Sequence, residues 1–342
     1  LAYQKIICDY RNSRAFNFRL ECSANPKKRC TVRVENLITN RTLLDELKEA
    51  RANRKPWLGK KAIPDINQYF SVKKFESLIN QTGIWNSEKL QVLIDNKQIP
   101  PNTLFQIQQT AKGTKHLLNA SKLQDVLNRG SSVVLNDVCE LSQGIMEIRE
   151  IFGTWTGGKL DCNVYFPQKG HQAFPIHYDV HDVLAIQVEG HKHWQIFPEG
   201  IEYPINHPIF LGRKQMNPAQ ERPPPILDFI FEPGDLVYIP SGYFHHATCL
   251  EGKSLHLSYG LVEMIGMDII SLAFEMAMRD SFFRTPVKAF LRNQDPSDFY
   301  LRKWSKKVTD LSRDPDFKKQ FKENLDNFKY RGKTISIPAD KD

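Results

Sequence analysis

The chain has 342 residues, of which 41% are hydrophobic and 11% aromatic, and a formal net charge of +8. This length suffices for one large domain or two modest ones with a real core. No apolar run approaches the roughly 18 residues that a membrane span needs. The first residues also lack a charged segment followed by an apolar core, so we expect neither a membrane protein nor a signal peptide.

Cysteine spacing bears on metal sites and on the cellular compartment. No two cysteines have the Cys-x-x-Cys spacing of structural zinc sites, and they are too sparse for a disulfide scaffold. This pattern favours a reducing cytosol, with the nucleus as the alternative in a eukaryote. Cys22 and Cys30 flank an expected turn and would face each other there, but we expect free thiols. The six cysteines are Cys8, Cys22, Cys30, Cys139, Cys162 and Cys249.

Residues 1–62 are interpreted as an appended basic module. Residues 1–60 hold 14 Lys and Arg against 6 Asp and Glu, so most of the positive charge lies at this end of the chain. Such a surface would attract nucleic acid, ribosomes or acidic peptides. An ordinary solvated basic surface is an equally good interpretation.

Alternating apolar residues predict two strands in this module, over 16–20 and 31–34, with a turn between them. A helix is predicted to begin near Thr42, where a capping-box pattern occurs, and to run to about Arg54. Pro64 marks the expected boundary with the next region.

Residues 65–150 are predicted to be largely helical. Ser71 precedes an amphipathic segment and is expected to be an N-cap. The other elements expected here are a helix over 121–127 ended by Gly130, a strand over 132–136, and a helix over 141–152 closed by Gly153.

From Gly157 the pattern changes to short strands separated by turns. A proline-rich segment over 200–228 is expected to be a long loop between strands. Strands at this spacing predict an antiparallel barrel or jelly roll. The expected strands are 160–166, 182–189, 192–197, 236–239 and 254–259.

Residues 263–342 return to helical periodicity. Ile265, Ile269, Leu272 and Met276 follow one another at spacings of three and four, which predicts about three helices in this region. These helices are expected to cover the barrel or to form a homodimer surface.

His177 and Asp179 are two residues apart, so in a strand their side chains would point to the same face. His245 follows a Pro-x-Gly turn and would supply a third ligand from another strand. Its neighbour His246 would point to the opposite face. Two histidines and one carboxylate on one metal leave open positions, as in non-haem Fe(II) oxygenases.

Three segments together resemble the cupin-type JmjC oxygenases, and within them the ribosomal-oxygenase-like branch. They are residues 177–179, 182–194 and 233–245, and the resemblance extends over about 120–262. It implies an α+β protein with a double-stranded β-helix over 63–262, a helical N-terminal flank and the helical C-terminal region. It also implies Fe(II), 2-oxoglutarate and O2.

The resemblance implies further site residues. Lys192 matches the basic residue that pairs with the far carboxylate of 2-oxoglutarate; an exposed hairpin lysine is the alternative. Asn163 and Tyr165 match a segment that lines the co-substrate pocket, with a buried polar pair as the alternative. Ser258 would share that pocket, whereas His256 on the same face has a structural interpretation of equal weight.

The implied activity is hydroxylation of a C–H bond, most often on a protein or peptide side chain. A ribosomal or nucleic-acid-associated partner is a further expectation. The alternatives are an N-methyl demethylase, a small-molecule hydroxylase, or a cupin that binds metal without turnover. The intact set of His177, Asp179, His245 and Lys192 argues against the last.

Overall fold

The computed structural model describes residues 33–94, 97–110, 113–168, 175–212, 223–290 and 296–328. The chain divides into two units, Leu1–Val32 and Arg33–Asp342, and every element below belongs to the second. The expected strand over 16–20, residues 31 and 32 and the Cys22–Cys30 pair lie outside the described residues. The expected strand over 31–34 is wrong at its described residues, because Arg33 precedes a helical turn that begins at Val34.

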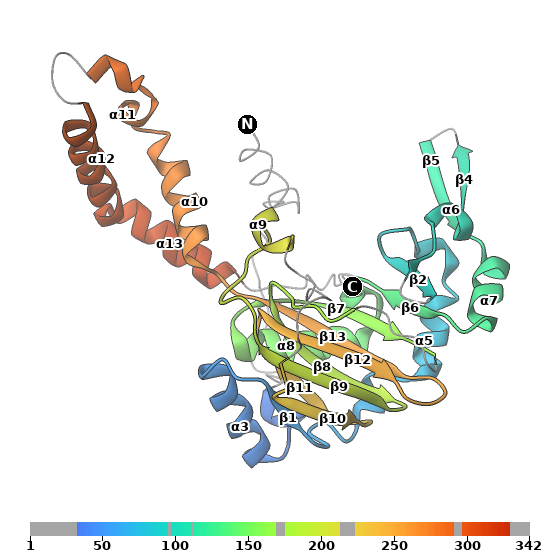
Figure 1. Cartoon of the computed structure of the whole chain (residues 1–342). Helices are drawn as coiled ribbons and strands as arrows, with labels where there is room; N and C mark the ends of the chain where they lie inside the picture. Colours follow the sequence, from blue (N-terminus) through green and yellow to red (C-terminus); the bar gives the residue numbers. More distant parts are fainter. Residues whose placement is uncertain are drawn as a thin grey trace, which may run out of the picture. The chain divides into compact units, whose positions relative to one another are not determined.

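An antiparallel sheet of eight strands forms the larger layer of the fold (Figure 1). Its outer face carries apolar side chains from every second residue, as alternation along a strand requires. The strands, in spatial order, are β1 (Trp57–Gly59), β11 (Leu236–Ile239), β8 (Asp182–Glu189), β13 (Leu255–Val262), β7 (Lys159–Phe166), β6 (Ser132–Leu135), β2 (Leu90–Ile94) and β3 (Lys97–Gln98).

A second antiparallel sheet faces the first. It consists of β10 (Leu227–Phe231), β9 (Lys192–Glu199) and β12 (Tyr243–Cys249), in that order. A small apolar core fills the space between the sheets and includes Val183, Trp194 and Ile196. This is the predicted double-stranded β-helix, and the α+β class is confirmed.

Helices cover the outer face of the larger sheet. They are α3 (Arg41–Ala52), α4 (Ile66–Tyr69), α5 (Val72–Ile79) and α8 (Gln143–Thr156), preceded by the single turn α2 (Val34–Leu37). Leu44 and Leu47 of α3 belong to the same buried cluster as the sheet, and β1 extends that sheet beside β11. The described part of the expected 1–62 module is therefore packed into the core.

Several predicted element ends are corrected by the structure. Helix α3 begins at Arg41, because the side chain of Asn40 accepts from the N–H groups of Thr42 and Leu43. Helix α8 continues past Gly153 and ends before Gly157, which has the left-handed conformation (φ 77°) common after helices. The predicted N-cap Ser71 is confirmed, since its hydroxyl accepts from the N–H of Lys74 at 3.3 Å.

The prediction that residues 65–150 are largely helical is wrong. Besides β6, which confirms the predicted strand over 132–136, strands β2 and β3 lie there, together with a hairpin of β4 (Phe105–Thr110) and β5 (Gly113–Leu118). The hairpin strands are mostly polar, and apolar residues alternate only over the first four residues of β4, so the usual strand signal is weak. The remaining elements here are η2 (Thr82–Ile84), α6 (Pro101–Leu104), α7 (Ala120–Asn128) and η3 (Cys139–Leu141).

The region after the barrel is helical, as predicted. A small core of Leu272, Met276 and Phe317 joins α10 to α13. No helix in the described ranges is long and apolar enough to cross a membrane. The elements are α10 (Gly266–Ala277), α11 (Ser281–Arg284), η4 (Val287–Phe290), α12 (Pro296–Arg313) and α13 (Pro315–Asn327).

Candidate metal centre

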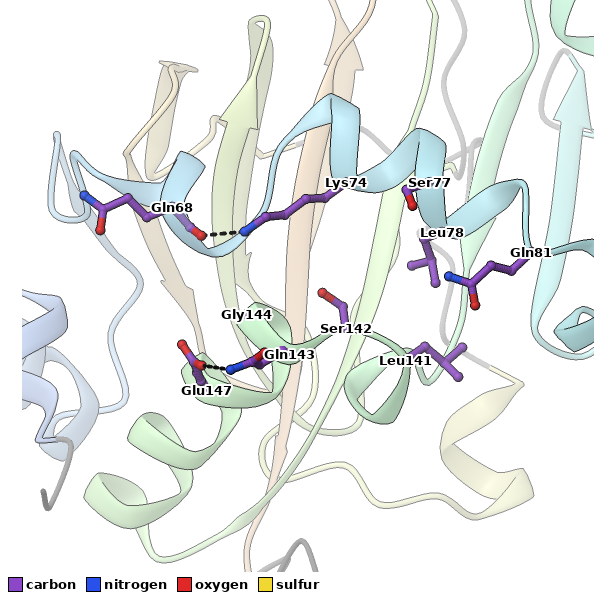
Figure 2. Close-up of a pocket in the computed structure, with 10 residues that line it drawn as sticks. All are labelled: Gln68, Lys74, Ser77, Leu78, Gln81, Leu141, Ser142, Gln143, Gly144 and Glu147. Carbon is purple, nitrogen blue, oxygen red and sulfur yellow. Dashed lines mark hydrogen bonds between the residues drawn. The ribbon is translucent and has the colours of Figure 1, made fainter. Parts of the chain in front are cut away.

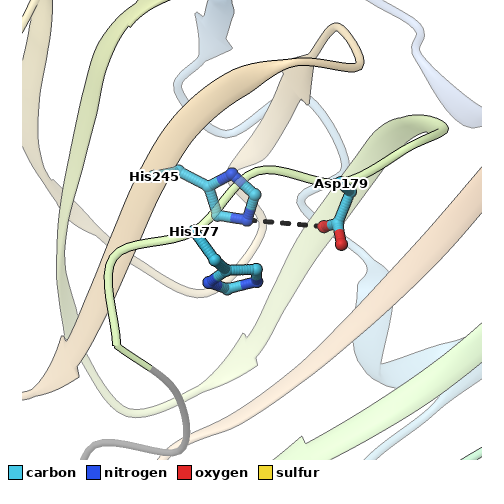
Figure 3. Close-up of side chains that lie close together, drawn as sticks. All are labelled: His177, Asp179 and His245. Atoms are coloured by element: carbon cyan, nitrogen blue, oxygen red, sulfur yellow. Dashed lines mark ion pairs between the residues drawn. The ribbon is translucent and has the colours of Figure 1, made fainter. Parts of the chain in front are cut away.

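The structure brings together His177, Asp179 and His245 (Figure 3). One possible ligand atom from each lies within 4.8 Å of the others. Nε2 of His245 is 3.5 Å from a carboxylate oxygen of Asp179, and the two imidazole centroids are 4.6 Å apart. The three side chains thus face one point from two segments that are distant in the sequence.

The segment that carries His177 and Asp179 is not the regular strand that was predicted. His177 forms an isolated bridge with His245, through backbone hydrogen bonds of 2.8 and 3.2 Å. The carbonyl of Asp179 accepts from the N–H of Gly242 at 2.9 Å. Gly242 has φ 88°, and a Cβ there would overlap the carbonyl oxygen of Ile201, so glycine is required.

Hydrogen bonds to the backbone fix both imidazole rings. Nδ1 of His177 is 2.8 Å from the carbonyl oxygen of Pro175, and Nδ1 of His245 is 3.1 Å from that of Tyr243. A carbonyl can only accept, so each Nδ1 carries the proton and each Nε2 has its lone pair directed elsewhere. Metal-binding histidines are commonly held this way, and the donor set suits Fe(II).

Lys192 lies inside the barrel, only 3% exposed. Its Nζ donates to Nδ1 of His256 at 2.9 Å, which joins the smaller sheet to the larger one. Burial lowers the pKa of Lys192 to about 7. Burial, and then the Lys192 charge, lower the pKa of His256 well below its usual range. Among the described residues this buried amine has no carboxylate partner, and such a group is suited to binding an anion.

Asn163, Tyr165 and Ser258 share the inner face of the larger sheet with His256. Strand register places Ser258 beside Asn163, and His256 beside Tyr165. The Tyr165 ring stacks on the His256 ring at a centroid distance of 4.7 Å. Burial, followed by the Asp179 charge, raises the pKa of Tyr165, which therefore stays a neutral hydroxyl. Asn163 also accepts from the N–H of Asp137 at 3.1 Å.

Comparison with protein families identifies residues 144–268 as a match to the JmjC domain model. Over this range the chain resembles a JmjC domain. The matched range contains the three converging side chains as well as Lys192 and the pocket residues described above.

Curated proteins similar to this chain include ribosomal oxygenases. Ribosomal oxygenase 2 of Mus musculus is 28% identical over 200 residues, which is 54% of this chain and 40% of that protein. The bifunctional lysine-specific demethylase and histidyl-hydroxylase NO66 of Aedes aegypti is 31% identical over 139 residues, which is 39% of this chain and 20% of that protein. The chain thus spans at most about two fifths of the length of these relatives.

Solved structures of YcfD from Escherichia coli share the fold. One, titled as E. coli ycfD, has a TM-score of 0.59 at 19% identity and covers 86% of this chain and 74% of that one. Another, described as a ribosomal oxygenase in complex with cobalt and 2-oxoglutarate, has a TM-score of 0.59 at 18% identity. The match covers 86% of this chain and 73% of that one.

Trp194 lies beside His245 and His256 but was not predicted as a candidate site residue. Its ring stacks on His245 at 6.0 Å and meets His256 edge-on at 5.9 Å. Its Nε1–H is buried and has no acceptor in the described part of the chain, so a polar ligand atom would satisfy it. Period-two alternation from Lys192 would have placed Trp194 on the inner face.

A pocket between helices contains none of these residues (Figure 2). It lies between α5 and α8 and is lined by neutral polar side chains, two leucines, Lys74 and Glu147. The ammonium group of Lys74 donates to the carbonyls of Gln68 and Tyr69, so it already has hydrogen-bond partners within the fold. This pocket carries no functional proposal.

Proposed function

We propose that this chain is an Fe(II)- and 2-oxoglutarate-dependent oxygenase that hydroxylates a C–H bond of a protein side chain. The observation that carries the proposal is the convergence of His177, Asp179 and His245, with both Nε2 atoms directed to a shared point. Its position within the range that matches the JmjC domain model supports the same activity.

In this proposal Nε2 of His177, Nε2 of His245 and the carboxylate of Asp179 would hold the iron. With O2 and 2-oxoglutarate, iron supplies the oxidising chemistry that no side chain can provide. Lys192 would pair with the far carboxylate of 2-oxoglutarate, and Trp194 would donate to an oxygen that enters the barrel. The carbonyls of Pro175 and Tyr243 keep both imidazoles in the ligand tautomer.

Asn163, Tyr165 and Ser258 would complete the co-substrate pocket. The hydroxyl of Tyr165 stays neutral, so it can donate to a carboxylate without repelling it. The apolar core between the sheets keeps water away from the buried amine, which strengthens its attraction for an anion.

The names of the relatives suggest the substrate. Ribosomal oxygenase and histidyl-hydroxylase both occur among them. We therefore propose a ribosomal protein side chain as the first candidate substrate, and a histidine as the first candidate residue. The basic residues before Arg33 would favour a ribosomal partner electrostatically. A cytoplasmic or nuclear location would follow, and the free thiols of Cys139, Cys162 and Cys249 agree with it.

N-methyl demethylation at the same site is the second candidate, because one relative's name includes lysine-specific demethylase. One experiment separates the two reactions. Ribosomal proteins are incubated with the chain, Fe(II), 2-oxoglutarate and O2, and then analysed by mass spectrometry beside a His177→Ala control.

We expect one added oxygen on a single protein and stoichiometric succinate, both absent from the control. Loss of a methyl group with release of formaldehyde would instead indicate demethylation. Bound metal and 2-oxoglutarate without turnover on protein, peptide or small-molecule candidates would favour a non-catalytic binding module.

For the domain division we propose an oxygenase domain that includes residues 33–62 and ends at 262, followed by the helical region over 263–342. The shared core of α3 and the barrel supports the first boundary, and the separate core of α10 and α13 supports the second.

We further propose that α10 forms a homodimer surface. Met267, Ile270, Phe274 and Met278 make an apolar stripe at helical spacing, and each is between 43% and 60% exposed. Exposed apolar stripes of this kind mark interaction surfaces. A dimer would cover them.

The double substitution Ile270→Asp with Phe274→Asp should convert a dimer to a monomer, because it places charges in the apolar stripe. Size-exclusion chromatography with light scattering measures the change. Lys322→Asp, on the exposed face of α13, serves as the control and should leave the mass unchanged. A wild-type mass of one chain at micromolar concentration would contradict the dimer.

A further inference from the structure

Arg54 has a backbone conformation that normally selects glycine. It follows α3 with φ 50°, and the N–H of Lys55 donates to the carbonyl of Ala50 at 2.9 Å, closing the helix end. Residues at this position of a helix end are usually glycine, since a Cβ is strained there. A side chain kept in such a place is a candidate for a specific role.

The Arg54 guanidinium holds the turn that precedes β12. Nη2 donates to the carbonyl of Ser241 at 3.0 Å and to its hydroxyl at 3.3 Å. Nη1 lies 3.8 Å from the Asp182 carboxylate, which itself accepts from the N–H of Ser241 and the hydroxyl of Tyr238. The Tyr203 ring packs on the guanidinium at 3.9 Å, and Tyr203 also has a positive φ, 44°.

The same turn connects to two of the three converging side chains. The N–H of Gly242, next to Ser241, donates to the carbonyl of Asp179 at 2.9 Å. The hydroxyl of Tyr243 donates to the carbonyl of Arg54 at 3.1 Å, and the carbonyl of Tyr243 fixes the ring of His245. Arg54 is therefore bonded to residues on either side of Gly242.

We propose that Arg54 is a positioning residue for the metal centre, holding the Ser241–Tyr243 turn so that Asp179 and His245 stay at the spacing a metal needs. The proposal rests on the proposed function only in that His177, Asp179 and His245 bind a metal. The proposal also gives α3 a role in the site, because Arg54 follows directly after this helix and reaches the turn from there.

Titration of the full chain with Co(II) tests the proposal, with the visible spectrum and the heat of binding as readouts. Arg54→Gly is the informative variant, because glycine suits the left-handed conformation and leaves the helix end intact. Loss of residues that orient metal ligands typically weakens metal binding roughly 10- to 100-fold, and we expect a loss in that range. Arg54→Lys should restore only part of it, since an ammonium cannot bond in the same fork geometry.

Arg51→Ala is the matched control. Arg51 lies on the same helix and is equally covered, with a side chain 24% exposed against 23% for Arg54, but it binds Glu263 and packs on Trp155. We expect this variant to melt at a lower temperature and to keep wild-type Co(II) affinity.

Wild-type affinity in Arg54→Gly, or an equal loss in Arg51→Ala, would overturn the role of Arg54. Should Arg54→Gly not fold, the comparison of Arg54→Lys with Arg51→Ala decides: equal Co(II) affinities overturn the proposal, and weaker binding by Arg54→Lys supports it. A wild-type chain that binds no Co(II), or a His177→Ala variant that binds it normally, would mean that the metal site itself is wrong.

Discussion

Alanine in place of His177 or Asp179 is expected to abolish metal binding and the conversion of 2-oxoglutarate to succinate, while the chain stays folded. Each substitution removes one of three ligands, so the affinity should fall by more than the roughly 10- to 100-fold that loss of an outer partner costs. Neither side chain belongs to an apolar core cluster of the described residues. The metal-free variants should therefore melt within about 2 °C of wild type, equivalent to about 1 kcal/mol for a chain of this length.

Thermal unfolding with and without Co(II) measures this prediction independently of activity. At a metal concentration 100 times the Kd, binding stabilises the folded state by about 2.7 kcal/mol, so the wild-type melting temperature rises and those of the variants do not. His246→Ala is the matched control, because its ring lies on the other face of β12, 3.4 Å from the Thr248 hydroxyl. Full turnover in either ligand variant would refute the assignment of the site.

The second large effect is expected from Lys192→Met, which should weaken 2-oxoglutarate binding and leave the metal-free chain as stable as wild type or more stable. A hydrogen bond to a charged group contributes about 1.5–3 kcal/mol, or roughly a 10- to 150-fold change in Kd. Methionine fills the same space without a buried amine, and this gain offsets the loss of the hydrogen bond to Nδ1 of His256. Lys253→Met, at an exposed turn, removes the same charge and should change neither quantity.

The pKa of Lys192 also determines how 2-oxoglutarate affinity and the stability of the metal-free chain should depend on pH. Burial lowers the pKa of Lys192 from 10.5 to about 7, so between these values the unfolded chain holds a proton that the folded chain lacks. Stability of the metal-free chain should accordingly rise with pH across this window, and the rise should be smaller in Lys192→Met. Of the other titratable groups facing the amine, His256 has a pKa lowered well below its usual range by burial, and burial raises the pKa of the Cys249 thiol.

Binding of 2-oxoglutarate should show the opposite trend. A carboxylate favours the charged amine, so affinity should fall as pH rises above about 7, with proton uptake on binding. Calorimetry in buffers of different ionisation enthalpy measures that uptake. An affinity and a proton count independent of pH, or unchanged binding in Lys192→Met, would mean that another group holds the far carboxylate.

The amino-acid sequence determined the elements that depend on local pattern. The short apolar run within 182–189 and the tight turn before 192–197 are enough to predict two barrel strands. A serine before an amphipathic segment is enough to predict the cap at Ser71. The three candidate ligands were also identified from sequence, because their spacing and the turn before His245 are local features that a metal-binding barrel requires.

Tertiary structure alone decided what holds these ligands in place. His177 and Asp179 do not lie in a regular strand. Backbone hydrogen bonds with His245 and Gly242, which are distant in the sequence, align them. The pairing of Lys192 with His256, and the reach of Arg54 to the Ser241 turn, join residues that are 64 and 187 positions apart. Sequence periodicity reports which face of an element is buried, but not which distant element covers it, so these contacts become visible only once the sheets and α3 are packed together.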